Sequence, residues 1–202
     1  MKNNKMIFLF AALALFLSAC TSTPEVTRVA SDTRTDLSGY WNDTDVRIVC
    51  GSLIDSCLND PKVAGEIARR GRLPVFLVGK FSNNSDEHID TSIISSTMET
   101  VIFKSGRADF VAGGDTRGQI RDERQDQQSN ASEESAKALG NETGADFLLT
   151  GSVKTIVDRA GGTITRTYYV NAELTNIENN TRLWMDQNSE IKKIIKMPGV
   201  KL

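Results

Sequence analysis

Three short apolar runs, each preceded by a stretch with the signals of a helix, constrain the fold of this 202-residue chain most strongly. The runs are Leu73–Phe81, Ala108–Gly113 and Ala145–Val153. The first is nearly continuous in apolar residues, which is typical of a strand that is covered on both faces. Helix and strand therefore alternate over the first three quarters of the chain, and this order predicts an α/β domain.

The first helix is expected to begin at Asn42 or Thr44, either of which can cap it, and to end before Pro61. Cys50 and Cys57 lie seven residues apart on its apolar stripe. At about 1.5 Å of rise per residue they are separated by about 10 Å along the helix axis, which is more than a disulfide allows between Cα atoms. We therefore expect two core thiols that are not bridged to each other.

Two further helices are expected between the apolar runs. One begins at Thr91 and is stopped by Gly106, and another is capped by Ser132 and ends near Gly144. The stretch from Asp115 to Asn130 is highly polar. It is either an exposed helix or a mobile excursion, and the sequence leaves both interpretations open.

The last part of the chain predicts strands with one buried face. Apolar residues from Ile164 to Leu174 largely follow the two-residue period of such a strand. Asn179 and Asn180 form a credible hairpin turn, which leads into a further strand within Thr181–Ile191. Together these elements predict one α/β domain with a mixed β-sheet flanked by helices and without an internal repeat.

The N-terminus has the pattern of an export signal. Lys2 and Lys5 precede an apolar stretch of twelve residues, Met6–Leu17, which is shorter than the roughly 20 residues that a membrane-spanning helix needs. The tetrapeptide Leu-Ser-Ala-Cys that ends at Cys20 resembles the bacterial lipoprotein box. An ordinary signal peptide that happens to contain a cysteine is the alternative, and we favour lipidation because both the residue types and the position fit.

This interpretation divides the chain into three parts. Residues 1–19 are expected to be a cleaved lipoprotein signal peptide, residues 20–38 a lipidated N-terminus at Cys20 with a flexible tether, and residues 39–202 the folded domain. Several acyl chains anchor a protein stably, so the mature protein is expected to be tethered to a membrane without spanning it. Thr21 after the cysteine resembles an outer-membrane sorting signal.

The charge of the chain gives no reason to expect a nucleic-acid partner. Without the leader, 22 basic residues stand against 26 acidic residues, which gives a net charge of −4. The densest basic cluster, Ala68–Arg72, is interpreted as a solvated helix end and not as a phosphate-binding patch.

The sequence also offers no clear catalytic group. The single histidine, His88, stands at the start of a helix among acidic residues, and an exposed surface position is the simpler interpretation. The glycines of Gly113–Gly118 do not have the spacing of a dinucleotide loop and are expected to form a strand-to-helix turn. We therefore expect a protein that is not an enzyme and that binds neither a cofactor nor a metal ion.

Several stretches taken together resemble the LpoB-type lipoproteins, the penicillin-binding protein activator family. They are the lipoprotein box at Cys20 and the segments GYWNDTD, PVFLVGKFSNN, ADFLLTGSV and YYVNAELTNIENNTRLW, which occur in this order between residues 39 and 190. The resemblance implies an outer-membrane-anchored periplasmic lipoprotein that is a monomer. It also implies binding and allosteric activation of a bifunctional penicillin-binding protein, a peptidoglycan synthase.

The loop Ser82, Asn83, Asn84 and Ser85 is the candidate contact with this partner, since it resembles the polar strand-to-helix loop of the family. Loops beyond the carboxyl ends of strands are the usual binding edge of open α/β sheets. Asparagine and serine also serve as turn and cap residues, which is the alternative role for this loop. Tyr40 and Trp41 are further candidates if they are exposed, although packing at the start of the first helix is the simpler expectation.

One departure from the family pattern concerns the tether. Enteric members carry a long Pro-rich linker, whereas Thr21–Ser38 has eighteen residues. Fully extended, these reach about 60 Å, and as a flexible coil roughly 25 Å. The identity of the partner and of the anchoring membrane is therefore left open.

Two other functions remain alternatives. A lipoprotein of a curli-type secretion or envelope assembly system would share the α/β core and form rings, but it needs additional membrane-inserting strands. The only candidate segment, Thr163–Glu190, is charged along its length and too short for two spanning hairpins. A surface or ligand-binding lipoprotein is the third hypothesis.

Overall fold

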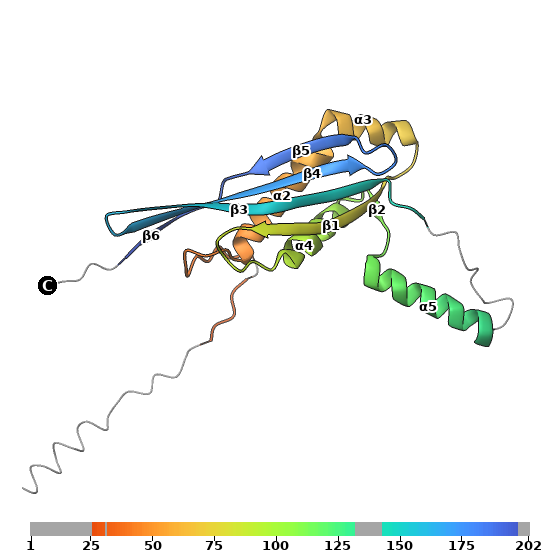
Figure 1. Ribbon diagram of the computed structural model, residues 1–202, viewed down its shortest axis with the longest axis horizontal. Helices are drawn as coiled ribbons and strands as arrows, with labels where there is room; N and C mark the ends of the chain where they lie inside the picture. Colours follow the sequence, from red (N-terminus) through yellow and green to blue (C-terminus); the bar gives the residue numbers. More distant parts are fainter. Residues whose placement is uncertain (1–25, 31, 132–142, 198–202) are drawn as a thin grey trace, which may run out of the picture. The chain divides into compact units, whose positions relative to one another are not determined.

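The computed structural model describes residues 26–30, 32–131 and 143–197 (Figure 1). The chain divides into two compact units, residues 1–33 and 34–202, and the second contains all the helices and strands described. The expected signal peptide, Cys20 and the helix expected from Ser132 lie outside the described residues. Within the described residues, no helix is both long enough and apolar enough to cross a membrane.

The described residues contain four helices: α2 (Asp43–Asn59), α3 (Pro61–Arg70), α4 (Thr91–Ser105) and α5 (Gly114–Asn130). Local signals set the ends of α2 and α4 as the sequence predicts. Asn42 caps α2 and forms a capping box with Asp45, and Gly106 ends α4 in the left-handed conformation. Pro61 does more than mark the end of α2, because it is also the first residue of α3.

The polar stretch from Asp115 to Asn130, for which two interpretations were open, is helical as part of α5. None of its described side chains is buried. The expected strand at Ala108–Gly113 shortens to the two residues of β2 (Asp109–Phe110), because the helix cap at Gly113 follows so closely. The strand-to-helix turn expected at Gly113–Gly118 is thus confirmed at its first residue.

The sheet is mixed, as predicted. Its strands are β1 (Val75–Asn84), β2, β3 (Phe147–Ala160), β4 (Thr163–Asn176), β5 (Arg182–Asn188) and β6 (Lys192–Lys196). The order is β2-β1-β3-β4-β5, and β6 pairs with the first part of β4. β1 runs parallel to β2 and β3, and the pairs that involve β4 are antiparallel. The turn at Asn180, where φ is 59°, was expected, whereas β6 was not.

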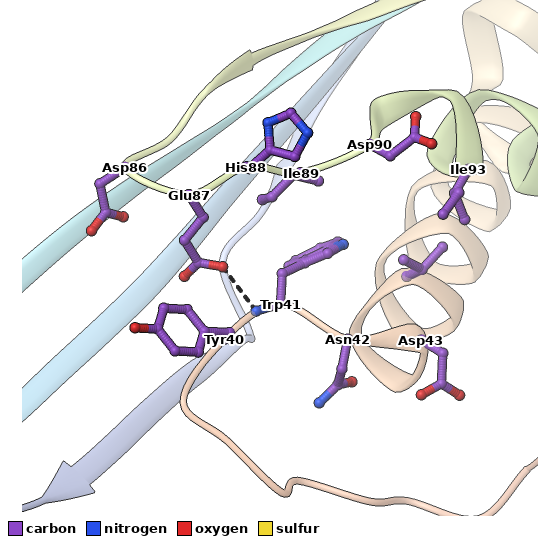
Figure 2. A pocket seen from close by; sticks show the side chains of 11 residues that line it. Tyr40, Trp41, Asn42, Asp43, Asp86, Glu87, His88, Ile89, Asp90 and Ile93 are labelled. Atoms are coloured by element: carbon purple, nitrogen blue, oxygen red, sulfur yellow. Dashed lines mark hydrogen bonds between the residues drawn. The ribbon is translucent and has the colours of Figure 1, made fainter.

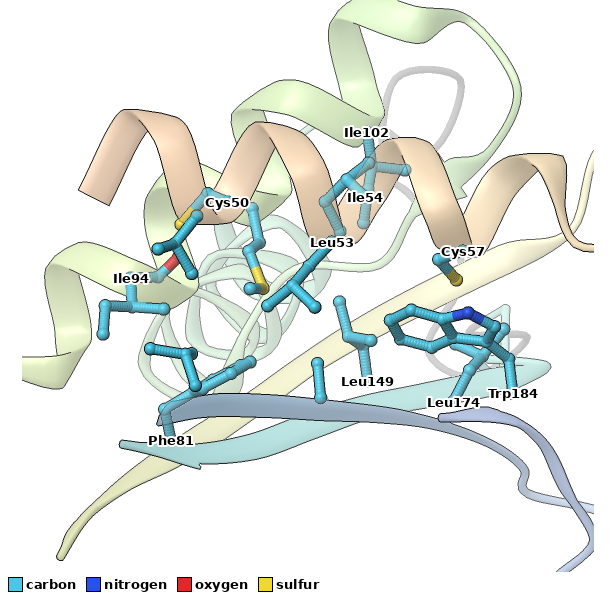
Figure 3. Close-up of a cluster of buried hydrophobic side chains, with 14 of the residues drawn as sticks. Cys50, Leu53, Ile54, Cys57, Phe81, Ile94, Ile102, Leu149, Leu174 and Trp184 are labelled. Atoms are coloured by element: carbon cyan, nitrogen blue, oxygen red, sulfur yellow. The ribbon is translucent and has the colours of Figure 1, made fainter. Parts of the chain in front are cut away.

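The helices α2 and α4 pack against each other and on one face of the sheet (Figures 1 and 3). On β4, every second residue from Tyr168 to Leu174 points into this core. Cys50 and Cys57 are buried there and unbridged, as predicted, and burial raises the pKa of both thiols to about 12. Leu77 and Leu148, paired on the opposite face, are only partly buried, so among the described residues this face is less completely covered than expected.

Candidate functional site

A groove lies where the N-terminal ends of α2 and α4 meet the loop between β1 and α4 (Figure 2). It encloses about 560 Å³ and is lined by residues from 40–46 and 86–93. The lining combines aromatic, aliphatic and acidic side chains. The groove therefore stands just beyond the carboxyl end of β1, the edge at which open α/β sheets usually bind ligands.

Both helices that face the groove are capped by side chains. Asn42 Oδ1 accepts a hydrogen bond from Asp45 N at 3.2 Å, and Asp45 Oδ2 accepts one from Asn42 N at 3.0 Å. Asp90 Oδ1 accepts one from Ser92 N at 3.0 Å. Amides at each helix start are thus occupied, and the carboxylates compensate the positive ends of the two helix dipoles.

One wall of the groove is the end of a segment that we call the N-terminal strap, residues 34–41. Lys193 of β6 fastens it, because Nζ donates to Tyr40 O at 2.7 Å and pairs with Asp36 at 3.1 Å. The same ammonium pairs with the buried Asp45 at 2.6 Å. Burial raises the pKa of Asp45 in spite of this pair. Lys193 therefore joins the strap, α2 and β6 at one point.

Gly39 brings the strap directly onto the sheet. A methyl group at this position would collide with the side chain of Ile195 on β6. The carbonyl oxygen of Gly39 accepts hydrogen bonds from Tyr168 Oη at 3.3 Å and Arg166 Nη1 at 3.4 Å. The Trp41 ring lies 5.1 Å from the Tyr168 ring, centroid to centroid. The strap is thus packed as part of the domain up to the first residue of α2.

Arg166 ties this wall to the opposite one. Its Nη2 lies 2.8 Å from Asp86 Oδ2, and its Nε lies 3.0 Å from Glu87 Oε1. Glu87 Oε2 accepts a hydrogen bond from Trp41 N at 3.0 Å (Figure 2). The side chains of Arg166 and Glu87 are each 7% exposed. The buried Glu87 carboxylate therefore joins the β1–α4 loop directly to the strap, and Arg166 of β4 compensates its charge.

The pKa values of this network follow from the same contacts. The pKa of Asp86 is lowered, first by the hydrogen bond from Thr155 and then by the one from Arg166. The pKa of Tyr168 is raised by burial and by its hydrogen bond to Glu87. Asp86 is thus held ionised and Tyr168 protonated, and neither is poised to transfer a proton near neutral pH.

The loop predicted to touch a partner is mostly occupied by its own hydrogen bonds. Asn83 Nδ2 donates to Glu87 O at 2.8 Å, and its Oδ1 accepts from Ser85 N at 3.0 Å and from Ser85 Oγ at 2.6 Å. Ser82 and Asn84 are exposed at the end of β1. The loop continues directly into the groove wall at Asp86, and its contact with a partner stays a prediction.

Of the other candidate residues, His88 and Tyr40 are exposed, whereas Trp41 is packed in the groove wall. His88 is exposed and lines the groove, as its position suggests. Trp41 packs on Tyr168, while Tyr40 is 58% exposed with the Arg166 guanidinium 5.0 Å from its ring centroid. Tyr40 is thus available at the surface, and Trp41 forms part of the groove wall.

Arg166 and Lys193 were missed by the sequence interpretation. Arg166 falls on the buried register of β4, two residues before Tyr168, and a charged residue at such a position signals a buried partner. Lys193 lies on β6, which the sequence did not predict. No sequence signal links either residue to the strap, because their partners are distant in the chain.

The basic cluster Ala68–Arg72 is a helix end, as expected, but it is not simply solvated. Arg70 and Arg72 both bind Asp146, at 2.6 Å and 2.8 Å. Asp146 Oδ2 also accepts a hydrogen bond from Val75 N at 2.8 Å. Burial opposes ionisation of Asp146, but the Arg72 and Val75 hydrogen bonds outweigh it, and its pKa is lowered. The cluster therefore joins α3 to the first residues of β1 and β3.

The groove combines exposed aromatic and aliphatic surface with carboxylates that are held by hydrogen bonds and ion pairs. In the part of the chain that the structure describes, no three His, Cys, Asp or Glu side chains are grouped to hold a metal ion.

Comparison with known proteins gives a family match over most of the domain. The model of the family "Peptidoglycan-synthase activator LpoB" matches residues 45–190. The search of curated proteins found no match. Similar solved structures include the LpoB C-terminal domain from Escherichia coli, which is 14% identical with a TM-score of 0.45, covering 71% of this chain and 96% of that one.

The LpoB C-terminal domain from Salmonella enterica is 14% identical with a TM-score of 0.43, and the match covers 76% of this chain and 99% of that one. Lipoprotein GNA1162 from Neisseria meningitidis is 17% identical with a TM-score of 0.39, and the match covers 60% of this chain and 83% of that one.

Proposed function

Because the chain belongs to the LpoB family of peptidoglycan-synthase activators, we propose that it binds a bifunctional penicillin-binding protein and activates it allosterically. The family match over residues 45–190 is the observation that carries this proposal, since it spans the domain from α2 to the end of β5. The groove and the exposed end of β1 fall within or beside this span. They offer a contact surface, which is what an activator without chemistry of its own requires.

Activation by contact has a thermodynamic condition. The protein must bind the active form of the synthase more tightly than the inactive form, and the ratio of the two affinities limits the acceleration. The domain acts as a monomer in this proposal and needs no cofactor. The contact surface includes Ser82 and Asn84, together with the loop that Asn83 and Ser85 hold in place.

Members of the LpoB family are envelope lipoproteins, and the proposed anchor is Cys20 after cleavage of residues 1–19. The acylated protein is proposed to sit in the outer membrane and face the periplasm. The strap begins at Arg34, so thirteen residues separate Cys20 from it. At 3.3–3.6 Å per residue they span at most about 45 Å, so the start of the folded domain must lie within that distance of the anchoring membrane.

The test is a binding titration between the soluble protein, residues 21–202, and each bifunctional penicillin-binding protein of the source organism. Saturable binding to at least one of them is expected. In cells, Cys20→Ala should abolish function, although the same chain binds normally in solution. Absence of binding to every synthase would overturn the activator role, and ring formation by the acylated protein on sizing would then favour the envelope assembly alternative.

A further inference from the structure

The groove between the strap and α4 exposes apolar side chains. Tyr40 is 58% exposed and Ile93 is 53% exposed, and both line it. Val46 and Ile89 are nearly buried in its floor. A concave volume of about 560 Å³ is large enough to accept side chains of another molecule. Exposed apolar area within a concavity marks an interaction site more often than isolated apolar residues do.

The walls of the groove are fixed before any partner arrives. Tyr40 and Trp41 belong to the strap, which Lys193 and Arg166 hold against the sheet. Trp41 N is bonded to Glu87 across the groove (Figure 2). A site of this kind loses little conformational entropy on binding, which favours affinity.

The charge of the groove indicates the chemistry of its occupant. Among the described residues, the lining contains four carboxylates, at Asp43, Asp86, Glu87 and Asp90, and no lysine or arginine. Arg47 pairs with Asp43, and Arg166 pairs with both Asp86 and Glu87. Four negative charges therefore face two positive ones, and the groove keeps an excess of negative charge.

The excess of negative charge favours a cationic occupant, and the positive ends of the helices α2 and α4 do not reverse this preference. Asn42 and Asp90 already accept hydrogen bonds from amides of the first turns of α2 and α4. An anion would have to displace these caps and approach the four carboxylates, which like-charge repulsion opposes. A cationic group meets neither obstacle.

We propose that this groove is the docking site for a segment of the partner synthase that presents a lysine or arginine beside an apolar side chain. The apolar side chain packs between Tyr40 and Ile93, and the cation faces Asp43 and Asp90. This inference rests on the proposed function for the existence of a synthase partner. It moves the main contact from the amides of the Asn83 loop to the adjoining groove.

A second groove provides the comparison. It encloses about 380 Å³ between α4 and β2 and is lined by Phe103 and Phe110, with one acidic and one basic side chain, Glu99 and Lys104. Phe103 is 68% exposed, more than Ile93. This groove is apolar but has balanced charge, so it carries no preference for a cationic partner.

The experiment measures the Kd of the synthase for three forms of residues 21–202: wild type, Ile93→Lys and Phe103→Lys. Both substitutions place a lysine at an exposed apolar position of α4, which makes Phe103→Lys a matched control. Ile93→Lys is expected to raise Kd at least tenfold, and Phe103→Lys less than twofold. Thermal unfolding of the three forms checks that each is folded.

A second variant tests the charge independently of the apolar contact. Asp43→Asn removes one carboxylate and leaves the Asn42 cap in place. It is expected to raise Kd and to make binding less sensitive to salt than that of wild type, because fewer opposite charges meet. Unchanged salt dependence would contradict the cationic occupant.

The outcomes separate the two proposals. Wild-type binding that Ile93→Lys leaves intact, or that Phe103→Lys weakens instead, overturns the docking site and leaves the activator role standing. Failure of wild type to bind any synthase overturns the activator role and the docking site with it.

Discussion

Two arginines at different places in the fold, one buried and one partly buried, have nearly the same surroundings. Arg166 pairs with Asp86 and Glu87, and its guanidinium lies 5.0 Å from the centroid of the Tyr40 ring. Arg70 pairs with Glu66 and Asp146, and its guanidinium lies 4.8 Å from the centroid of the Phe147 ring.

The two clusters differ in the exposure of the aromatic ring beside each arginine. Phe147 is fully buried, so the Arg70 cluster only joins α3 to the sheet. Tyr40 is exposed and lines the groove, so the Arg166 cluster positions a groove wall that is accessible to another molecule. The same chemistry thus stabilises the fold at one place and shapes a surface at the other.

The largest expected effect is that of removing Arg166. Arg166→Met leaves the buried Glu87 carboxylate without a cation, so it should lower the free energy of unfolding by about 3–5 kcal/mol, measured by urea titration. Arg70→Met should cost less, because Arg69 still pairs with Glu66 and Arg72 still pairs with Asp146. Only Arg166→Met should release the strap, seen as increased solvent quenching of Trp41 fluorescence relative to Arg70→Met. Equal quenching in both variants would mean that the strap does not depend on Arg166.

A smaller effect is expected from Asp146→Asn, which removes charge-assisted hydrogen bonds worth about 1.5–3 kcal/mol at neutral pH. The pKa of Asp146 is lowered in the folded state, so its stabilising contribution is complete above its unfolded value of 3.8 and is lost as pH falls through the folded pKa. Stability measured from pH 7 down to pH 2 should therefore fall less steeply in Asp146→Asn than in wild type.

Asp86→Asn is the counterpart of Asp146→Asn at the groove. The pKa of Asp86 is lowered too, but its side chain is 41% exposed and more screened by solvent. The fall in stability between pH 7 and pH 2 should therefore differ less from wild type in Asp86→Asn than in Asp146→Asn. A larger change in Asp86→Asn would mean that the groove cluster is the more buried of the two in solution.

Gly39→Ala tests how closely the strap packs on β6. The added methyl group meets Ile195, and such overpacking costs about 1–3 kcal/mol. Gly51→Ala, in the middle of α2 with open space around the new methyl group, should stabilise by about 0.5–1 kcal/mol. Thermal unfolding of both variants measures these changes in stability. A Gly39→Ala variant as stable as wild type would show that the strap is loosely packed on β6.

The smallest effects separate two neighbouring asparagines. Asn83→Ala removes the hydrogen bonds that shape the β1–α4 loop and should cost about 1 kcal/mol, whereas exposed Asn84→Ala should change stability by less than about 0.5 kcal/mol. Chemical denaturation of the pair checks this. If Asn84→Ala proves the more destabilising, the hydrogen bonds of Asn83 do not organise the loop.

Local interactions explain which parts of the fold could be predicted from the sequence. The cap at Asn42 depends on a residue three positions away, and Gly106 and Asn180 depend on their own backbone conformation, so all three could be predicted. The strand β6 has only five residues and gains its place by pairing with β4, which no local pattern reveals.

The groove was harder to predict because its parts are far apart in the chain. Trp41 and Glu87 are 46 residues apart, and Tyr168 and Glu87 are 81 residues apart. Arg166 stood on the correct face of its strand, but its sequence position could not identify the carboxylates that it binds. The loop that adjoins the groove could be singled out from its sequence, whereas the strap that forms the other wall could not.

Whether the protein is an activator is decided by the rate of glycan-strand synthesis from lipid II by a bifunctional penicillin-binding protein, measured at increasing concentrations of residues 21–202. We expect a saturable rise in rate with wild type, and at least a tenfold higher concentration of Ile93→Lys for the same half-maximal effect. A rate that wild type leaves unchanged for every bifunctional synthase of the organism would contradict activation by this protein.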